Sequence, residues 1–159
     1  MNALTVNQEQ TAGTRVGSPD EPVYAVVGFD GSASSVRALD TAARLLNDRA
    51  GGLEVVYVAR QGVEDTRERD TTRELSEEVR ARLQASRRRA AAQRWHFQRR
   101  DGVIADNLVA VADDLRDRHG PDAAVFLAVG RSDHGYHHAI GSVPAALERH
   151  VHYPVIVIP

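Results

Sequence analysis

The sequence contains no cysteine, and all 20 of its basic residues other than histidine are arginine, so it has no lysine either. Without cysteine the chain has no disulfide framework, no thiolate zinc site and no cysteine nucleophile. Without lysine it has no phosphate-binding lysine of a P-loop. No apolar run approaches membrane-spanning length, and residues 1–22 lack the positive start and apolar stretch of a secretory signal. We therefore expect a protein of the reducing cytoplasm with no membrane partner.

The length and composition of the sequence indicate one globular domain. A length of 159 residues is close to the usual size of a single domain, and 42% hydrophobic residues are too many for a disordered chain. The formal net charge of -2 offers no general attraction to nucleic acid, so no nucleic-acid partner is expected. We expect a flexible tail over residues 1–22 and a folded domain over residues 23–159.

Short apolar runs recur along the chain, bounded by glycine, proline and polar residues. Three of them have the composition of strands buried on both faces of a parallel sheet, and VIVI is expected to be a terminal strand. WHFQR alternates apolar and polar residues and indicates a strand nearer the sheet edge. The five predicted strands are Tyr24–Phe29, Leu53–Val58, Trp95–Arg99, Ala123–Val129 and Val155–Ile158.

Helical patterns fill the segments between these runs. The serines at positions 32, 34 and 35 are N-cap candidates for a first helix, and Gly51-Gly52 is expected to stop it. The polar stretch Arg60–Asp70 is predicted to be a surface loop, followed by a capping box of Thr71 and Glu74 that opens the second helix. An apolar stripe of Ile104, Leu108, Ala112 and Leu115 predicts a third helix, which His119-Gly120-Pro121 is expected to end. A fourth helix is expected to open at Ser142 with Pro144 in its first turn.

Strict alternation of strands and helices predicts an α/β fold with a doubly wound parallel five-stranded sheet and helices on both faces, in three layers. Ligands bind to such sheets at the carboxyl ends of the strands, where the winding reverses direction. The candidate segments are Gly28–Ser32, after the first strand, and Gly130–Ser142, after the fourth.

The second of these segments has the residues of an anion site. Glycines let backbone amides approach a phosphate, and the amino end of a helix favours negative charge. The same residues have a purely structural interpretation, in which Gly130 only ends a strand and Ser142 only caps a helix. The pattern by itself leaves both alternatives open.

Three parts of the chain together resemble the universal stress protein family. They are Asp30-Gly31-Ser32, Val58 at the end of the second strand, and the stretch from Gly130 through Gly141-Ser142-Val143 to Tyr153–Ile158. The likeness covers residues 23–159. It implies a flavodoxin-like, Rossmann-like sheet ordered 3-2-1-4-5, usually in a homodimer, and a role in the stress response. Many members bind ATP or a related adenine nucleotide such as AMP or cyclic AMP.

The resemblance also implies roles for single residues. Asp30 lies near the adenine and ribose, and Val58 lines the adenine pocket. Magnesium accompanies the ligand if it is a triphosphate. The residues that hold ribose and phosphates are Gly130, Gly141, Ser142 and Val143.

The loop departs from the family's nucleotide-binding pattern, which is Gly, two residues, Gly, nine residues, then Gly-Ser or Gly-Thr. Here it reads GRSDHGYHHAIGS, with Asp133 at the second glycine position and two residues fewer before Gly141. A carboxylate beside a triphosphate costs energy unless a metal or a cation offsets it, and Arg131 could offset part of the charge. An alignment on Gly135 gives the wrong spacing on both sides, and a monophosphate is the alternative ligand.

Neither a metal site nor an enzyme is predicted. The histidines at positions 134, 137 and 138 of this loop are interpreted as solvated, because their spacing fixes no ligand geometry. The chain has no G-x-S-x-G turn, and Phe29-Asp30-Gly31-Ser32 replaces the Ser-Gly-Gly loop of ATP pyrophosphatase-type enzymes.

Two classes of function therefore remain. The first is a stress protein that senses an adenine nucleotide between Asp30 and the loop after the fourth strand. The second is a dimeric interaction module that does not bind a nucleotide because its loop is degenerate. The terminal strand Val155–Ile158 is expected to pair with its copy in a homodimer, because pairing would cover an exposed sheet edge. The alternative is that it pairs only within its own chain.

Overall fold

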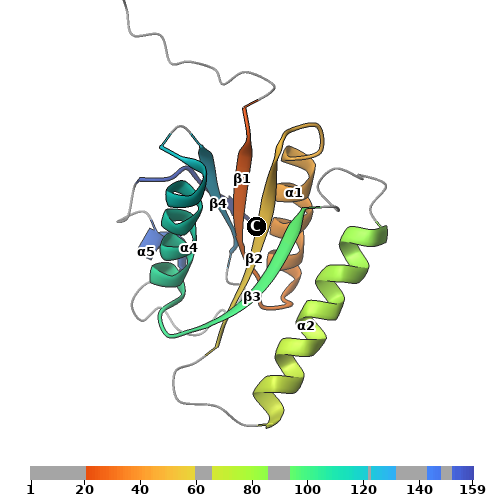
Figure 1. The fold of residues 1–159 in the computed structure, drawn as a ribbon. Helices are drawn as coiled ribbons and strands as arrows, with labels where there is room; N and C mark the ends of the chain where they lie inside the picture. The colour runs from red at the N-terminus through yellow and green to blue at the C-terminus, as the bar shows by residue number, and fades with distance from the viewer. Residues whose placement is uncertain (1–20, 60–65, 86–93, 122, 132–142, 148–151) are drawn as a thin grey trace, which may run out of the picture.

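The structure is a computed structural model that describes residues 21–59, 66–85, 94–121, 123–131, 143–147 and 152–159. A single sheet of five parallel strands forms its centre (Figure 1). The strands are β1 (Val23–Gly28), β2 (Gly51–Ala59), β3 (Trp95–Asp101), β4 (Ala124–Gly130) and β5 (Val155–Ile158). Their order in the sheet is β3-β2-β1-β4-β5. This confirms the predicted α/β class, the parallel pairing and the strand order.

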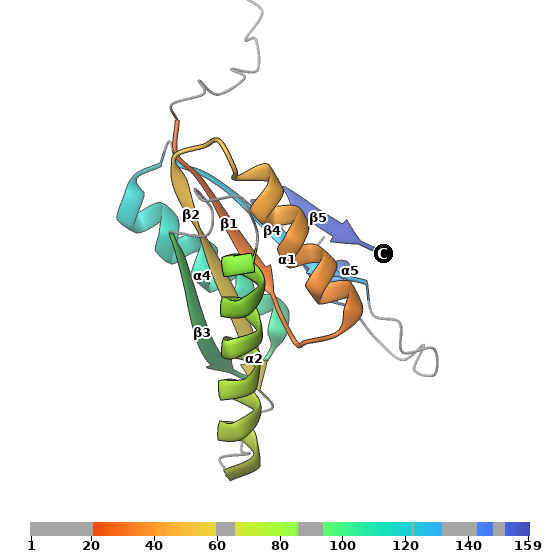
Figure 2. The same cartoon turned by 90° about the vertical axis from the view of Figure 1, so that its right-hand side faces the viewer.

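Helices cover both faces of the sheet, which gives the three expected layers. They are α1 (Ala33–Leu45), α2 (Thr66–Ala85), α4 (Ile104–His119) and α5 (Val143–Leu147). Helices α1 and α2 lie against one face, and α4 and α5 lie against the other (Figures 1 and 2). The sheet is therefore buried on both sides along its central strands.

The central strand β1 shows why the apolar runs are continuous. Ala25 and Val27 pack toward α1, and Val26 between them packs toward α4. All three side chains are fully buried. Because successive residues at the centre of this strand enter two separate apolar cores, a polar side chain at any of these three positions would be buried without a partner.

Strand β3 lies at one edge of the sheet, as its alternating composition predicted. Two ion pairs occupy its carboxyl end. Arg99 contacts Asp101 at 2.7 Å, and Arg100 contacts Asp114 of α4 at 3.3 Å. The strand is longer than expected, because it continues through these charged residues to Asp101.

Two sequence predictions about the helices are wrong. Helix α2 begins at Thr66 rather than at the Thr71 capping box, so the predicted loop Arg60–Asp70 contains the first turn of a helix. The hydroxyl of Thr72, one turn further on, donates a hydrogen bond back to the carbonyl oxygen of Glu68 in this first turn at 2.8 Å. The turn escaped prediction because its charged residues carry no apolar periodicity, and the first buried side chain of α2 is Leu75.

The Gly51-Gly52 pair does not stop α1 but starts β2. Gly51 has a φ of 121°, and a Cβ at this position would lie 1.8 Å from the carbonyl oxygen of Val23. The pair therefore allows β2 to approach the start of β1 closely, whereas α1 already ends at Leu45.

Candidate functional site

The turn between β1 and α1 is built from Asp30, Gly31 and Ser32. Gly31 has a φ of +79°, a left-handed conformation that glycine adopts without strain. Ser32 then caps α1, because its hydroxyl oxygen accepts a hydrogen bond from the backbone N–H of Ser35 at 3.2 Å. A short turn thus places Asp30 at the amino end of α1.

Hydrogen bonds keep Asp30 ionised. Burial by itself raises the pKa of this carboxyl, but hydrogen bonds with Ser32 and Ser35 outweigh it and hold the pKa below its ordinary value. The backbone N–H of Ser32 donates to Oδ1 of Asp30 at 3.0 Å. The negative charge also suits the positive end of the α1 dipole.

Two further serines extend this polar cluster inward. Among the described residues, Ser34 and Ser35 are the two polar side chains that are buried. The Ser35 hydroxyl donates to the carbonyl oxygen of Ser32 at 3.0 Å, and the Ser34 and Ser32 hydroxyl oxygens lie 3.3 Å apart. The cluster is held together by its own hydrogen bonds.

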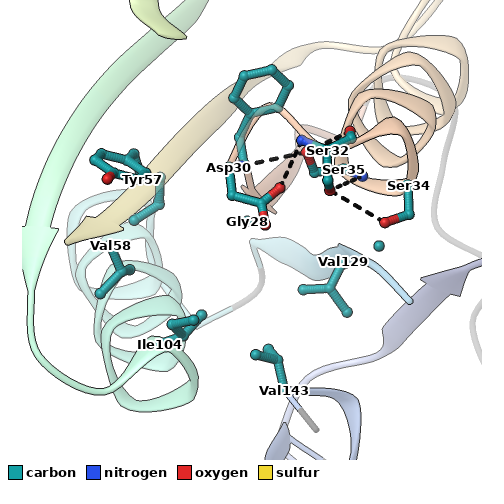
Figure 3. A pocket seen from close by; sticks show the side chains of 13 residues that line it. Gly28, Asp30, Ser32, Ser34, Ser35, Tyr57, Val58, Ile104, Val129 and Val143 are labelled. Carbon is teal, nitrogen blue, oxygen red and sulfur yellow. Dashed lines mark hydrogen bonds between the residues drawn. The ribbon is translucent and has the colours of Figure 1, made fainter. Parts of the chain in front are cut away.

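A cavity of about 150 Å³ opens beside this cluster, at the carboxyl ends of β1, β2 and β4 (Figure 3). A single water needs roughly 15 Å³ on the same scale, so the cavity has room for a small ring system. One side of it is polar, formed by Asp30 and the three serines. The other side is aliphatic, with Val56, Val58, Ile104, Val129 and Val143.

The structure brings together four of the residues that the resemblance assigned to ligand binding. Asp30, Val58, Gly130 and Val143 all line the cavity. Arg131 does not line it; this residue is exposed, and its backbone N–H donates to the carbonyl oxygen of Ile158 at 2.7 Å. Gly141 and Ser142 lie outside the described residues, as do Asp133 and the loop histidines.

Gly130 ends β4 and also touches α1. A Cβ at Gly130 would lie 2.5 Å from the carbonyl carbon of Ser34 and 2.6 Å from the backbone nitrogen of Ser35. Glycine is therefore required for the end of β4 to pack against the first turn of α1. This contact gives the residue a structural role besides any contact with a ligand.

Tyr57 connects the rim of the cavity to α2. Its hydroxyl donates a hydrogen bond to Oε1 of Glu68 at 2.7 Å. Burial, together with the hydrogen bond and the charge of Glu68, raises the pKa of Tyr57 to about 12. The first turn of α2, which was predicted to be loop, thus contributes to the surroundings of the site.

A second tyrosine makes a similar bond at the opposite end of the sheet. Tyr153 donates to Oδ1 of Asp113 at 2.5 Å, and the guanidinium of Arg116 lies 5.7 Å from the centre of its ring. Burial and the bond to Asp113 raise the pKa of Tyr153 to about 12. This contact ties the segment before β5 to α4.

Several residues of the cavity were not assigned to a site from the sequence. Ile104 and Val129 were expected only as parts of a helix and a strand, and Ser34 and Ser35 only as helix caps. Helical spacing predicts burial of Ile104, strand composition predicts burial of Val129, and capping accounts for the serines, but none of these patterns says which end of the sheet a residue reaches.

The described residues were also searched for metal sites and membrane spans. In those ranges no three histidine, aspartate or glutamate side chains group in a way that could hold a metal ion. Of the helices with described residues, none is long and apolar enough to cross a membrane.

Comparison with solved structures finds the same fold elsewhere. A universal stress protein crystallised in complex with cAMP is 25% identical, with 89% of this chain and 98% of that chain covered and a TM-score of 0.62. A universal stress protein from Archaeoglobus fulgidus is 21% identical, with coverage of 87% and 98% and a TM-score of 0.62. One from Burkholderia pseudomallei is 23% identical, with coverage of 86% and 95% and a TM-score of 0.58.

Comparison with curated proteins finds no match. The model of the universal stress protein family matches residues 25–159. This match spans every strand of the sheet except the first two residues of β1, and it includes all the residues around the cavity. The chain therefore belongs to the universal stress protein family.

Proposed function

We propose that the chain binds an adenine nucleotide in the cavity at the carboxyl ends of β1, β2 and β4, and that this binding regulates a stress-response function. The observation that carries the proposal is the division of the cavity into a polar side with Asp30 and an aliphatic side with Val58 and Val143. A nucleoside is divided in the same way, because the faces of its base are apolar and its sugar is polar. The solved universal stress protein in complex with cAMP supports the same ligand class.

The two sides would contact different parts of the ligand. The valine side chains pack against the faces of the base, as in most small-molecule pockets. The ionised carboxylate of Asp30 accepts hydrogen bonds, so it suits an exocyclic amine or ribose hydroxyls. Gly130 and Val143 flank the loop that the family resemblance assigns to the phosphates.

Binding would act by stabilising the folded state. A ligand that binds only the folded protein at 100 times its Kd stabilises it by about 2.7 kcal/mol. Such a ligand also favours whichever conformation binds it more tightly, which is how occupancy could change the affinity for a partner.

The test is the thermal midpoint of the purified protein with millimolar ATP, AMP or cyclic AMP, in the presence of magnesium. We expect at least one of them to raise it, and Asp30→Asn to reduce that rise. The matched control is Asp40→Asn, which removes an exposed carboxylate of α1 outside the cavity. No rise with any of the three, or equal rises in both variants, would contradict the proposal.

A second candidate function is that of a dimeric interaction module that works without a nucleotide. It is favoured by β5, an edge strand of the sheet whose Val157 side chain is 42% exposed. Pairing of β5 with its copy would cover this edge and this side chain. Light scattering coupled to size exclusion tests the homodimer: we expect a dimer for the wild type and a monomer for Val157→Glu. A wild-type monomer would contradict it.

Neither candidate includes a chemical step, so we propose that the protein is not an enzyme. The check is release of phosphate from ATP by the purified protein over hours, compared with Asp30→Asn. Release that depends on Asp30 would overturn this part of the proposal.

A further inference from the structure

The first half of α2 extends past the sheet on the side where the cavity lies. In both views the lower turns of this helix reach beyond the carboxyl ends of the strands (Figures 1 and 2). The buried side chains of α2 are Leu75, Val79 and Leu83, so residues 66–74, which we call the overhang, place no side chain in the core. A helical segment without a buried apolar face gains little stability from packing, so its local opening costs little free energy.

A hydrogen bond joins the overhang to the wall of the cavity. Tyr57, near the end of β2, is one of the lining residues (Figure 3), and its hydroxyl donates to Oε1 of Glu68 at 2.7 Å. Because the pKa of Tyr57 is raised to about 12, this hydroxyl keeps its proton and remains a donor at neutral pH. The backbone of the same glutamate accepts the bond from Thr72. Glu68 therefore links a side chain of the cavity wall to the helical turns of the overhang.

The anchored half of α2 begins against the turn that carries Asp30. A Cβ at Gly31 would lie 2.8 Å from Cδ2 of Leu75, so Leu75 packs directly on this backbone. Leu75 is 8% exposed and belongs to the same apolar core as α1. Leu75 thus fixes one end of the overhang, and the bond between Tyr57 and Glu68 holds it nearer its other end.

A ligand that fills the cavity would act on this bond. Tyr57 is half-buried, so a ligand beside it would restrict its side chain and remove water from its surroundings. A hydrogen bond is stronger in surroundings of lower dielectric. Ligand binding and attachment of the overhang would therefore favour each other, and by the same factor in both directions.

We propose that the overhang is a switch segment controlled by the cavity, in which a bound nucleotide strengthens the bond between Tyr57 and Glu68 and keeps residues 66–74 helical and attached. This rests on the proposed function, and it supplies the step between occupancy and regulation. The overhang exposes the side chains of Arg67, Arg69 and Arg73. Its attachment therefore sets how these charges are presented to a partner beside the cavity.

The experiment is amide hydrogen exchange of the full-length protein, followed by NMR with and without millimolar ATP, AMP or cyclic AMP. The amides of residues 70–74 are the reporters, because the first four N–H groups of a helix have no partner within it. We expect a nucleotide that raises the thermal midpoint to slow their exchange by about fivefold or more, which is the lower end of couplings between two sites.

Tyr57→Phe keeps the ring in the cavity wall and removes the hydroxyl. Without a nucleotide, losing a hydrogen bond to a charged group should speed exchange of residues 70–74 by about tenfold. The nucleotide should no longer slow this exchange, and its Kd should rise by at most the factor of slowing seen in the wild type. Tyr153→Phe is the matched control, because it removes a similar bond to Asp113 at the opposite end of the sheet and should leave exchange of residues 70–74 unchanged.

A second pair of variants tests the other partner of the bond. Glu68→Ala removes the acceptor and should abolish the slowing by the nucleotide, whereas Glu68→Gln keeps an acceptor oxygen and should retain part of it. Glu74→Ala is the matched control, because it truncates an exposed glutamate of the same segment and should respond to the nucleotide as the wild type does.

The outcomes separate this inference from the proposed function. If a nucleotide raises the thermal midpoint but does not slow exchange of residues 70–74, the switch is refuted while nucleotide binding stands. Equal slowing in the wild type and Tyr57→Phe, or in Glu68→Ala and Glu74→Ala, refutes it as well. If no nucleotide raises the thermal midpoint, both proposals fail.

Discussion

Replacing Gly130 by alanine tests the contact between β4 and α1. The added Cβ would lie 2.5 Å from the carbonyl carbon of Ser34, 2.6 Å from its Oγ and 2.6 Å from the backbone nitrogen of Ser35. Two of these three atoms belong to the backbone and cannot rotate away, so the strand or the helix must move. Overpacking of this kind costs about 1–3 kcal/mol, and the backbone contacts place Gly130→Ala near 3 kcal/mol.

This loss is measurable in two ways. Since 1 kcal/mol corresponds to about 2–4 °C in a chain of this length, the thermal midpoint should fall by about 6–12 °C. Urea unfolding followed by circular dichroism should give the same loss of unfolding free energy with an unchanged slope.

Gly28→Ala is the matched control, because Gly28 lines the same cavity at the end of the neighbouring strand. The atoms nearest its added Cβ would belong to side chains, with Cδ1 of Leu108 at 3.3 Å and Cγ1 of Val129 at 3.4 Å. Both can yield by a few tenths of an ångström, and alanine also restricts the unfolded chain, so the net change should stay below about 1 kcal/mol. Equal stability of the two variants would refute the structural role of Gly130.

Three further predictions concern pH and helix capping. The folded pKa of about 12 for Tyr57 and Tyr153 exceeds the unfolded value of about 10. Their contribution to the unfolding free energy is therefore complete below pH ~10 and is lost as pH rises toward 12. Urea unfolding across this range should show a smaller loss of unfolding free energy in Tyr57→Phe and Tyr153→Phe than in the wild type. The lowered pKa of Asp30 makes the unfolding free energy depend on pH in the opposite direction. The contribution of Asp30 to this free energy is present above an unfolded pKa of about 3.9 and is lost as pH falls through the folded value. Asp30→Asn should therefore lose less stability in acid than the wild type in the same assay. Val103 is the N-cap of α4, and its side chain makes no capping hydrogen bond. Val103→Ser should supply this bond, add about 1 kcal/mol to the unfolding free energy and raise the thermal midpoint by about 2–4 °C. No rise would show that Asn107, whose Nδ2 donates to the carbonyl oxygen of Val103 at 2.9 Å, already replaces the cap.

The central strands β1, β2 and β4 could be predicted from the sequence because each contributes buried side chains to the cores on both faces of the sheet. The edge strands β3 and β5 could be predicted because their apolar side chains pack partly against these cores. The predicted run Tyr24–Phe29 differs from β1 by one residue at each end, and Val155–Ile158 agrees with β5. Gly51-Gly52 was assigned wrongly, because glycine marks both the end of a helix and a close approach of two strands. The start of α2 was missed, since a first turn of charged residues has the composition of a loop.

The site was only partly predictable for a different reason. Asp30 and Val58 belong to local patterns that a resemblance can identify in the sequence. Ile104 belongs to the site because the turn at Gly102 brings the start of α4 beside the ends of β1 and β2, which no local pattern encodes. Tyr57 and Glu68 meet across 11 positions of sequence that include residues predicted to be loop.

The two edges of the sheet differ in a way that limits assembly. The β3 edge carries ion pairs between Arg99 and Asp101 and between Arg100 and Asp114, whereas β5 is a run of four aliphatic residues. Charged edges resist the addition of another strand, and aliphatic ones invite it. If two copies join through β5, the joined sheet presents β3 at both of its ends. Growth then stops at two copies, so the chemistry of the remote strand β3 would set the size of the assembly that β5 begins.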